Sequence, residues 1–335
     1  MCVRNCCFLL LCIGLLVVRP ATAQNPFDDS TAGNPFAQME EAAETPGDQM
    51  AAAIDSGSIA AVRRLLDAGM SPDTMVYGGP ALQWATYDDR YYVVKLLVDR
   101  GADVDLTDEY GNTTLMVASS QGSVKIVKLL LDKDANVNAV EKLYGLSALQ
   151  NACEAGNDEV FDLLVEHGAD IKHVDKYGGN CLEEAAFSGA KSIVEKLQAK
   201  GLKSKWPLHV AAGLGNTEQV KKLLADGADP SKANDGWKNT PLHFAAGAQH
   251  LEVAKLLKEK DANLDAKNVF GATPLHYAAN EDNLEFAKWL VEQGADINAV
   301  DEEGMTVRDW SGEQVDEYLG TKGAEYGEWE EEMEE

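Results

Sequence analysis

The stretch "NTPLHFAAG" at residues 239–247 recurs almost unchanged as "ATPLHYAAN" at 272–280 and as "KWPLHVAAG" at 205–213. Each copy holds one histidine in the same local context. Three histidines repeated in this way could be metal ligands, catalytic bases or parts of a scaffold. The spacing of the copies decides among these interpretations.

The leucine that precedes each histidine defines a period. It occupies positions 208, 242 and 275, so the steps are 34 and 33 residues. Earlier leucines continue the series, at Leu82, Leu115, Leu149 and Leu182. A constant internal period of this length indicates a repeat array, in which each unit packs against its neighbours.

Each unit carries the same local signals. A glycine follows most of these leucines after seven residues, and an amphipathic stretch such as "VVKLLVDRGADVD" (93–105) comes next. A second glycine, such as Gly101 or Gly294, stands where that stretch ends, because a positive φ there costs no Cβ clash. The pattern predicts a short helix, a turn, a second helix and an extended segment in every unit.

These features resemble the ankyrin repeat. The matching residues are "TPLHFAA" (240–246), "TPLHYAA" (273–279), "GADVD" (101–105) and "GADIN" (294–298). The resemblance covers about residues 49–319, as eight repeats and a degenerate C-terminal unit. It implies an all-α repeat solenoid over residues 49–322, with helix-turn-helix repeats and β-hairpin fingers, that binds other proteins and is not an enzyme.

One step of the series is short. Leu182 and Leu208 are 26 residues apart, and the shortening lies after Gly201, which precedes its leucine by seven residues where Gly168 precedes its own by 14. The missing residues are one finger, near 201–206. A gap or bend in the row of fingers is one interpretation. We favour a tolerated deletion in a surface loop, because loops accept such changes.

The repeat places all three histidines in the first turn of a helix. Thr240 and Thr273 stand at the N-cap, and a proline follows where a missing N–H is harmless. Equivalent positions in neighbouring repeats lie about 8–10 Å apart, whereas zinc needs each ligand nitrogen at about 2.0 Å. We therefore predict that His209, His243 and His276 are buried and structural.

Motifs of catalysis are missing from the sequence. It contains no HExxH, no GxSxG, no phosphate-binding loop and no closely spaced cysteine pair after the leader. We expect no catalytic residue, no metal site and no cofactor. An enzyme with an unrecognised site remains an alternative.

Aromatic residues recur at the predicted finger tips. They are Tyr77, Tyr110, Tyr144, Tyr177, Trp237 and Phe270. Tyrosine and tryptophan are enriched among residues that dominate binding, although a tyrosine before this glycine could serve only to brace the turn. The resemblance adds residues of the first helices, at positions that ankyrin proteins commonly use for binding: Tyr87, Asp88, Gln121, Glu154 and Phe187.

The first 23 residues predict a secretory signal peptide. One arginine precedes an apolar run at 6–18, and "ATA" (21–23) precedes a predicted cleavage after Ala23. The run is too short to span a membrane comfortably. We expect a secreted or periplasmic protein with no stable membrane span, in which a flexible acidic linker at 24–48 leads to the solenoid.

The chain is strongly acidic. It has 29 basic and 56 acidic residues, a net charge of −27, and loss of Arg4 and Arg19 with the leader would leave 27 basic residues and a charge of −29. Such a charge opposes binding to nucleic acid and favours a protein partner with a basic patch, or simply solubility. The last residues, 323–335, are expected to be an acidic disordered tail.

Together these features predict an exported protein-binding module that displays an acidic, aromatic concave surface. A protector or inhibitor of an exported enzyme is the alternative role, and a purely structural spacer is another.

Two cysteines remain after the leader, Cys153 and Cys181. The repeat alignment predicts that their Cα atoms are more than about 10 Å apart, too far for a disulfide. We expect both to be unpaired, Cys153 buried and Cys181 partly accessible.

Overall fold

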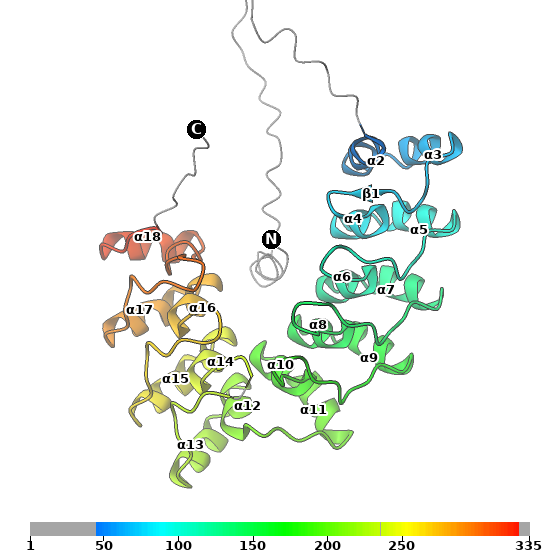
Figure 1. Ribbon diagram of the computed structural model, residues 1–335. Coiled ribbons are helices and arrows are strands. Elements are labelled where there is room, and N and C mark those ends of the chain that lie inside the picture. Colours follow the sequence, from blue (N-terminus) through cyan, green and yellow to red (C-terminus); the bar gives the residue numbers. More distant parts are fainter. Residues whose placement is uncertain (1–44, 235, 328–335) are drawn as a thin grey trace, which may run out of the picture.

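The computed structural model describes residues 45–234 and 236–327, which form helix pairs stacked into an open crescent (Figure 1). The first helices of the pairs are α2 (Pro46–Asp55), α4 (Ala81–Tyr87), α6 (Thr114–Gln121), α8 (Ala148–Glu154), α10 (Cys181–Phe187), α12 (Pro207–Gly213), α14 (Pro241–Gly247) and α16 (Pro274–Asn280). The second helices are α3 (Ile59–Asp67), α5 (Tyr91–Asp99), α7 (Val124–Leu131), α9 (Asp158–Glu166), α11 (Lys191–Ala199), α13 (Thr217–Ala225), α15 (Leu251–Lys258) and α17 (Leu284–Glu292). A single helix, α18 (Glu313–Thr321), ends the array. The all-α repeat solenoid is as predicted.

The repeated Thr-Pro-Leu-His motif starts a helix. Thr273 has extended backbone (φ −99°, ψ 167°) and Pro274 takes the first helical position. The backbone N–H of Thr273 donates to Nδ1 of His276 at 3.1 Å. Histidine thus does here what glutamate does in a capping box, satisfying an N–H that the helix itself leaves unpaired.

The fingers are short hairpins held by a side chain at their base. In the first, β1 (Met75–Val76) pairs with β2 (Gly79–Pro80) in antiparallel register. In most later fingers a carboxylate or amide side chain at the base binds backbone N–H groups of the tip, as Asp108, Glu141, Asp175, Asn268 and Asp301 do. Asp108 accepts the backbone N–H groups of Tyr110 and Asn112 at 3.0 and 2.8 Å. This repeated turn fixes where each tip aromatic is displayed.

The periodic leucines form the spine of the core. None is more than 4% exposed, and burying a side chain of this size contributes about 1.5–3 kcal/mol. Alanines such as Ala211, Ala245 and Ala278 lie on the same first helices and are also buried. Small residues there let successive first helices pack closely against each other.

The array bends where its finger is missing. Residues 201–206 run directly from α11 to α12, and the two arms of the crescent diverge from this base (Figure 1). There α10 lies beside α14 as well as α12. This arrangement fits the other interpretation, a bend in the row of fingers, better than the tolerated loop deletion that we favoured, because without an intervening finger the fingers on either side touch each other.

Two glycines make this closure possible. A Cβ atom at Gly236 would lie 2.2 Å from the carbonyl oxygen of Tyr177, and one at Gly213 would lie 1.9 Å from that of Ala186. No side chain tolerates such distances, so the bend requires glycine at both positions.

The solenoid extends beyond both predicted boundaries. At the N-terminus Thr45 caps α2 through a capping box with Asp48, so the helix begins at Pro46 rather than at 49. At the C-terminus the backbone N–H of Gly327 donates to Asp309 at 2.9 Å. Residues 323–327, expected to begin the tail, therefore belong to the fold.

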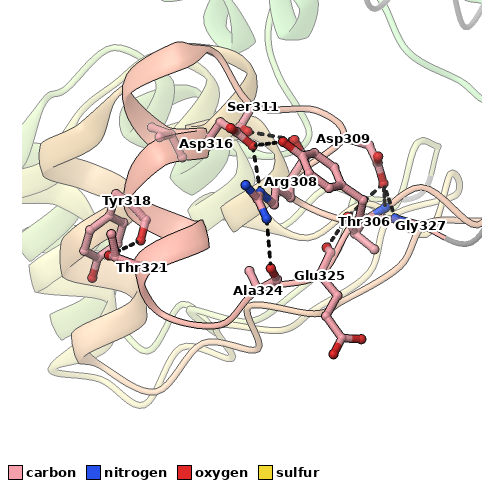
Figure 2. A network of polar contacts seen from close by, with 12 residues as sticks. Thr306, Arg308, Asp309, Ser311, Asp316, Tyr318, Thr321, Ala324, Glu325 and Gly327 are labelled. Atoms are coloured by element: carbon pink, nitrogen blue, oxygen red, sulfur yellow. Dashed lines mark hydrogen bonds and ion pairs between the residues drawn. The ribbon is translucent and has the colours of Figure 1, made fainter.

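The C-terminal unit closes the array with a polar network (Figure 2). Arg308 donates through Nε to Asp316 at 2.8 Å and through a terminal nitrogen to the carbonyl of Ala324 at 3.3 Å. Tyr326 donates its hydroxyl to Asp316 at 2.7 Å. This unit gives the last repeat a polar outer end, which repeat arrays need in place of a neighbour. The predicted leader, nearly all of the linker and residues 328–335 lie outside the described residues.

Candidate partner-binding site

Four of the six predicted tip aromatics meet at the bend. Tyr177 and Trp237 are 4.7 Å apart between ring centroids, Trp237 stacks on Phe270 at 5.3 Å, and Tyr144 lies 5.6 Å from Trp237. Tyr177 is 41% exposed, whereas Trp237 is 6% exposed. We call Tyr144, Tyr177, Trp237 and Phe270 the aromatic cluster. It exists because the missing finger brings the tips at 177 and 237 into contact.

The other two tip aromatics lie outside this cluster. Tyr77 packs against Trp84 of α4 at 5.0 Å and is 49% exposed. Tyr110 is half-buried and forms no ring pair with another residue in the described part of the chain. The six tips therefore do not form one row of equivalent positions: four meet at the bend and two lie apart in the N-terminal arm.

The predicted first-helix residues are divided in the same way. Gln121 donates to the carbonyl of Tyr87 at 3.0 Å, and Asp88 lies 3.7 Å from Arg90, all in the N-terminal arm. Glu154 and Phe187 instead lie at the bend.

A small cavity at the bend joins the aromatic cluster to buried carboxyls. Its volume is about 20 Å³. Its lining is Leu146, Glu154, Gly179, Glu183, Glu184, Phe187, Asn234, Trp237, Asn239 and Phe244. None of these described residues is basic. We call it the bend cavity.

The carboxyls around this cavity disfavour ionisation. Burial raises the pKa of Glu154 to about 7. Burial also raises the pKa of Glu184 well above its ordinary value, and the charges of Glu154, Asp175 and Glu183 add to the effect. Carboxyls that repel one another in a poorly solvated place hold their protons more readily, and a cation placed among them would favour their charged forms.

Hydrogen bonds hold the wall of the cavity. The indole N–H of Trp237 donates to Oε1 of Glu184 at 3.2 Å. Gly179 lies beside this hydrogen bond, since a Cβ atom there would meet Trp237 Nε1 at 2.8 Å and Glu184 Oε1 at 3.0 Å. Any larger residue at 179 would fill the space.

Sequence reasoning missed Asp175, Glu183, Glu184 and Asn234. A signal for two of them was present. Counted from the periodic leucine, Glu183 and Glu184 occupy the positions that His243 and Phe244 hold in "TPLHFAA". Two acids thus stand where another repeat has a buried histidine and a buried phenylalanine.

All three repeated histidines are buried, as predicted. His243 and His276 bond the N-cap of their own helix, whereas His209 bonds the carbonyl of Asn239, through Nε2 at 3.1 Å. His243 is fully buried, accepts the N–H of Thr240 at Nδ1 (3.1 Å) and bonds the carbonyl of Ala272 through Nε2 (3.1 Å). Burial lowers its pKa to about 4. Among the residues that the structure describes, no group of three His, Cys, Asp or Glu side chains could hold a metal ion.

Both cysteines are unpaired, as predicted, and both are fully buried. The expectation that Cys181 is partly accessible was wrong, because α8 and α14 cover the helix on which it lies. The thiols are also neighbours: burial first, and then a hydrogen bond with Cys181, raise the pKa of Cys153. The predicted separation of more than about 10 Å between the two Cα atoms was therefore wrong, because thiols that share a hydrogen bond lie closer than that.

Comparison with known proteins agrees with the repeat architecture. A family model for ankyrin repeats matches three overlapping or adjacent segments, residues 49–141, 115–205 and 208–301. None of the helices in residues 45–234 and 236–327 is long and apolar enough to cross a bilayer.

Three curated relatives share about 30% identity with part of the chain. The Transient receptor potential cation channel subfamily A member 1 homolog of Caenorhabditis elegans is 31% identical over 35% of this chain and 10% of its own length. The E3 ubiquitin-protein ligase KEG of Arabidopsis thaliana is 31% identical over 34% of this chain and 8% of its own. Ankyrin repeat and SAM domain-containing protein 6 of Danio rerio is 30% identical over 37% and 18%.

The matched region therefore spans less than a fifth of each of these relatives. Their names describe a cation channel homolog, a ubiquitin-protein ligase and a protein with ankyrin repeats and a SAM domain, and the matched region is a small part of each. The family model, in contrast, covers most of this sequence. The chain belongs to the ankyrin repeat family.

Proposed function

We propose that this chain is a non-enzymatic binding module that holds a protein partner against the base of its crescent. Ankyrin repeats generally mediate interactions between proteins. The observation that supports a site at the bend is the aromatic cluster, which gathers rings from four fingers beside the bend cavity. Large aromatic side chains clustered near the centre of a concave surface are typical of the residues that dominate binding.

This proposal also predicts that the partner carries a basic patch. The whole chain has a net charge of −27, and the bend cavity adds carboxyls that have no basic residue among the described lining. Complementary charge speeds the encounter between proteins and suppresses partners of the wrong sign. Nucleic acid is disfavoured for the same electrostatic reason.

Export is part of the proposal and rests on the sequence. The predicted signal peptide would deliver the module outside the cytoplasm, to the periplasm or the surroundings of the cell. A module in that compartment could protect or inhibit an exported enzyme, which is the alternative role within the same binding function.

A capture experiment tests the site. The full chain and its Tyr177→Ala variant are used as baits for the envelope fraction, followed by mass spectrometry. Tyr77→Ala is the matched control, because Tyr77 is a tip tyrosine of similar exposure outside the aromatic cluster.

We expect a captured protein to be lost with Tyr177→Ala and retained with Tyr77→Ala. Equal capture by both variants would contradict a site at the bend.

A further inference from the structure

The bend cavity has the chemistry of a receptor for a cation. Its acidic lining comes from two repeats, with Glu154 at the end of α8 and Glu183 and Glu184 in α10. Glu154, Glu184 and Phe187 are only partly buried, so solvent reaches the cavity. An acidic lining alone does not define a ligand, and two further observations do so.

The first observation is that unsatisfied polar atoms at the cavity are acceptors. Oδ1 of Asn234, a residue only 7% exposed, has no hydrogen-bond partner within the described structure, and Oδ2 of Asp175, a residue 5% exposed, has beside it only the Trp237 indole N–H that already donates to Glu184. Asn234 lines the cavity, and Asp175 Oδ2 lies beside the lining residue Gly179. Buried acceptors without donors are costly. A group that binds at these atoms must therefore bring N–H or O–H donors.

The second observation is the set of rings and the size of the space. Phe187, Trp237 and Phe244 line the same cavity, and aromatic faces attract cations. A volume of about 20 Å³ has room for about one water-sized group. A metal ion does not fit these observations, because the described carboxyls form no group that could hold one.

An ammonium group meets every requirement. It carries one positive charge, three donors and no acceptor, and it has about the size of water. A guanidinium group is larger and planar. The side chain that presents an ammonium group on a protein is lysine, whose apolar stem can lie along rings such as Phe187.

A larger cavity adjoins the first but suits this ligand less well. Its volume is about 280 Å³, and it shares Gly179, Glu183 and Asn234 with the bend cavity. Lys203 and Lys205 line it. Their charges oppose a second ammonium group there, which favours the smaller cavity.

We propose that the bend cavity binds the ammonium group of a lysine side chain presented by the protein partner. The inference rests on the proposed binding function and specifies its chemistry. The ammonium group favours the charged forms of Glu154 and Glu184, which then pair with it, while Asn234 and Asp175 supply acceptors and the rings enclose the lysine stem.

The test titrates the full chain with Nα-acetyl-lysine amide while the indole N–H resonance of Trp237 is followed by NMR. Nα-acetyl-norleucine amide, which has the stem without the charge, is the control ligand. We expect a saturable shift with a dissociation constant on the order of millimolar for the lysine amide, and none for the norleucine amide.

Variants test whether the NMR shift arises from binding of the lysine amide in the bend cavity. Glu184→Gln and Glu154→Gln should each weaken binding about tenfold, while Glu285→Gln, an exposed change on α17, should leave it unaltered. Far-ultraviolet circular dichroism confirms that each variant is folded. Two glutamate variants are used so that the result does not depend on one of them folding.

No saturable shift with the lysine amide, an equal shift with the norleucine amide, or unaltered binding by both folded glutamate variants would each overturn the inference. The proposed function is judged separately. If capture still depends on Tyr177 while the lysine amide does not bind, the cavity has another role and the binding module stands.

Discussion

Replacing Glu154 by glutamine should stabilise the protein at neutral and alkaline pH. The carboxyl is held in a poorly solvated position at the bend, near Glu184 and Tyr277, both of which sense its charge. Glutamine keeps the shape and the hydrogen-bonding oxygen but cannot ionise. The substitution therefore isolates the electrostatic cost of this one carboxylate.

The magnitude follows from the pKa of Glu154, which rises from an ordinary 4.5 to about 7. At about 1.36 kcal/mol for each pH unit between the two values, ionisation destabilises the folded chain by at most about 3 kcal/mol. The side chain keeps part of its surface exposed, so water screens the charge, and we expect about 1–2 kcal/mol.

The direction of the pKa shift determines the pH range over which the substitution changes stability. Between pH 4.5 and about 7 the folded chain holds a proton that the unfolded chain releases, so stability falls as the pH rises through this range. The gain from Glu154→Gln should therefore be complete above this window and absent below it.

Thermal unfolding followed by circular dichroism measures the effect. At pH 8 the variant should melt about 2–4 °C above the parent for each kcal/mol gained, and at pH 4 the two should coincide. Glu285→Gln, an exposed change, should move the midpoint little at either pH. An equal gain at both pH values, or none at pH 8, would refute the argument that burial of a charge is responsible.

Three other predictions concern the partner, the bend and the thiols. Association with a basic partner should slow as salt rises, because exposed charges are screened over about 8 Å at physiological ionic strength; a stopped-flow rate that is flat with salt would mean that the acidity serves solubility alone. Gly213→Ala should destabilise the array by about 1–3 kcal/mol, because the new Cβ would meet the Ala186 carbonyl. Small-angle scattering should show a wider crescent. Unchanged stability and shape would show that this glycine does not set the bend. Cys153 and Cys181 should resist alkylation in the folded protein, react after unfolding and show no bridge by mass spectrometry without reductant; rapid labelling of native Cys181 would contradict its burial.

The sequence was sufficient to predict the repeats and their register. The leucine series marks positions that immediate neighbours bury, so a constant period is enough to place them. The same reasoning predicted the role of His243 and His276, since the motif that starts each helix contains its own capping partner.

The site was predicted only in part, for a physical reason. Periodicity describes contacts between adjacent repeats, but Phe187 of α10 packs on Phe244 of α14 and on Tyr277 of α16, each at 5.1 Å between ring centroids. These contacts depend on the angle of the bend, and this angle cannot be obtained from the spacing of residues in the sequence. The sequence therefore named Glu154, Phe187 and Trp237 separately and did not predict that they meet.

Because one finger is missing, the curvature of this protein depends on the length of a connecting loop and not on the leucines of its core. Repeats of equal length distribute curvature evenly, so changing it would mean altering many packed interfaces together. Here the interval from Gly201 to Leu208 is seven residues where its counterpart from Gly168 to Leu182 is 14, and the turning is concentrated at that point. The length of this loop can therefore change while the buried leucines stay the same. During evolution, an insertion or deletion in this solvent-exposed connector could open or close the crescent.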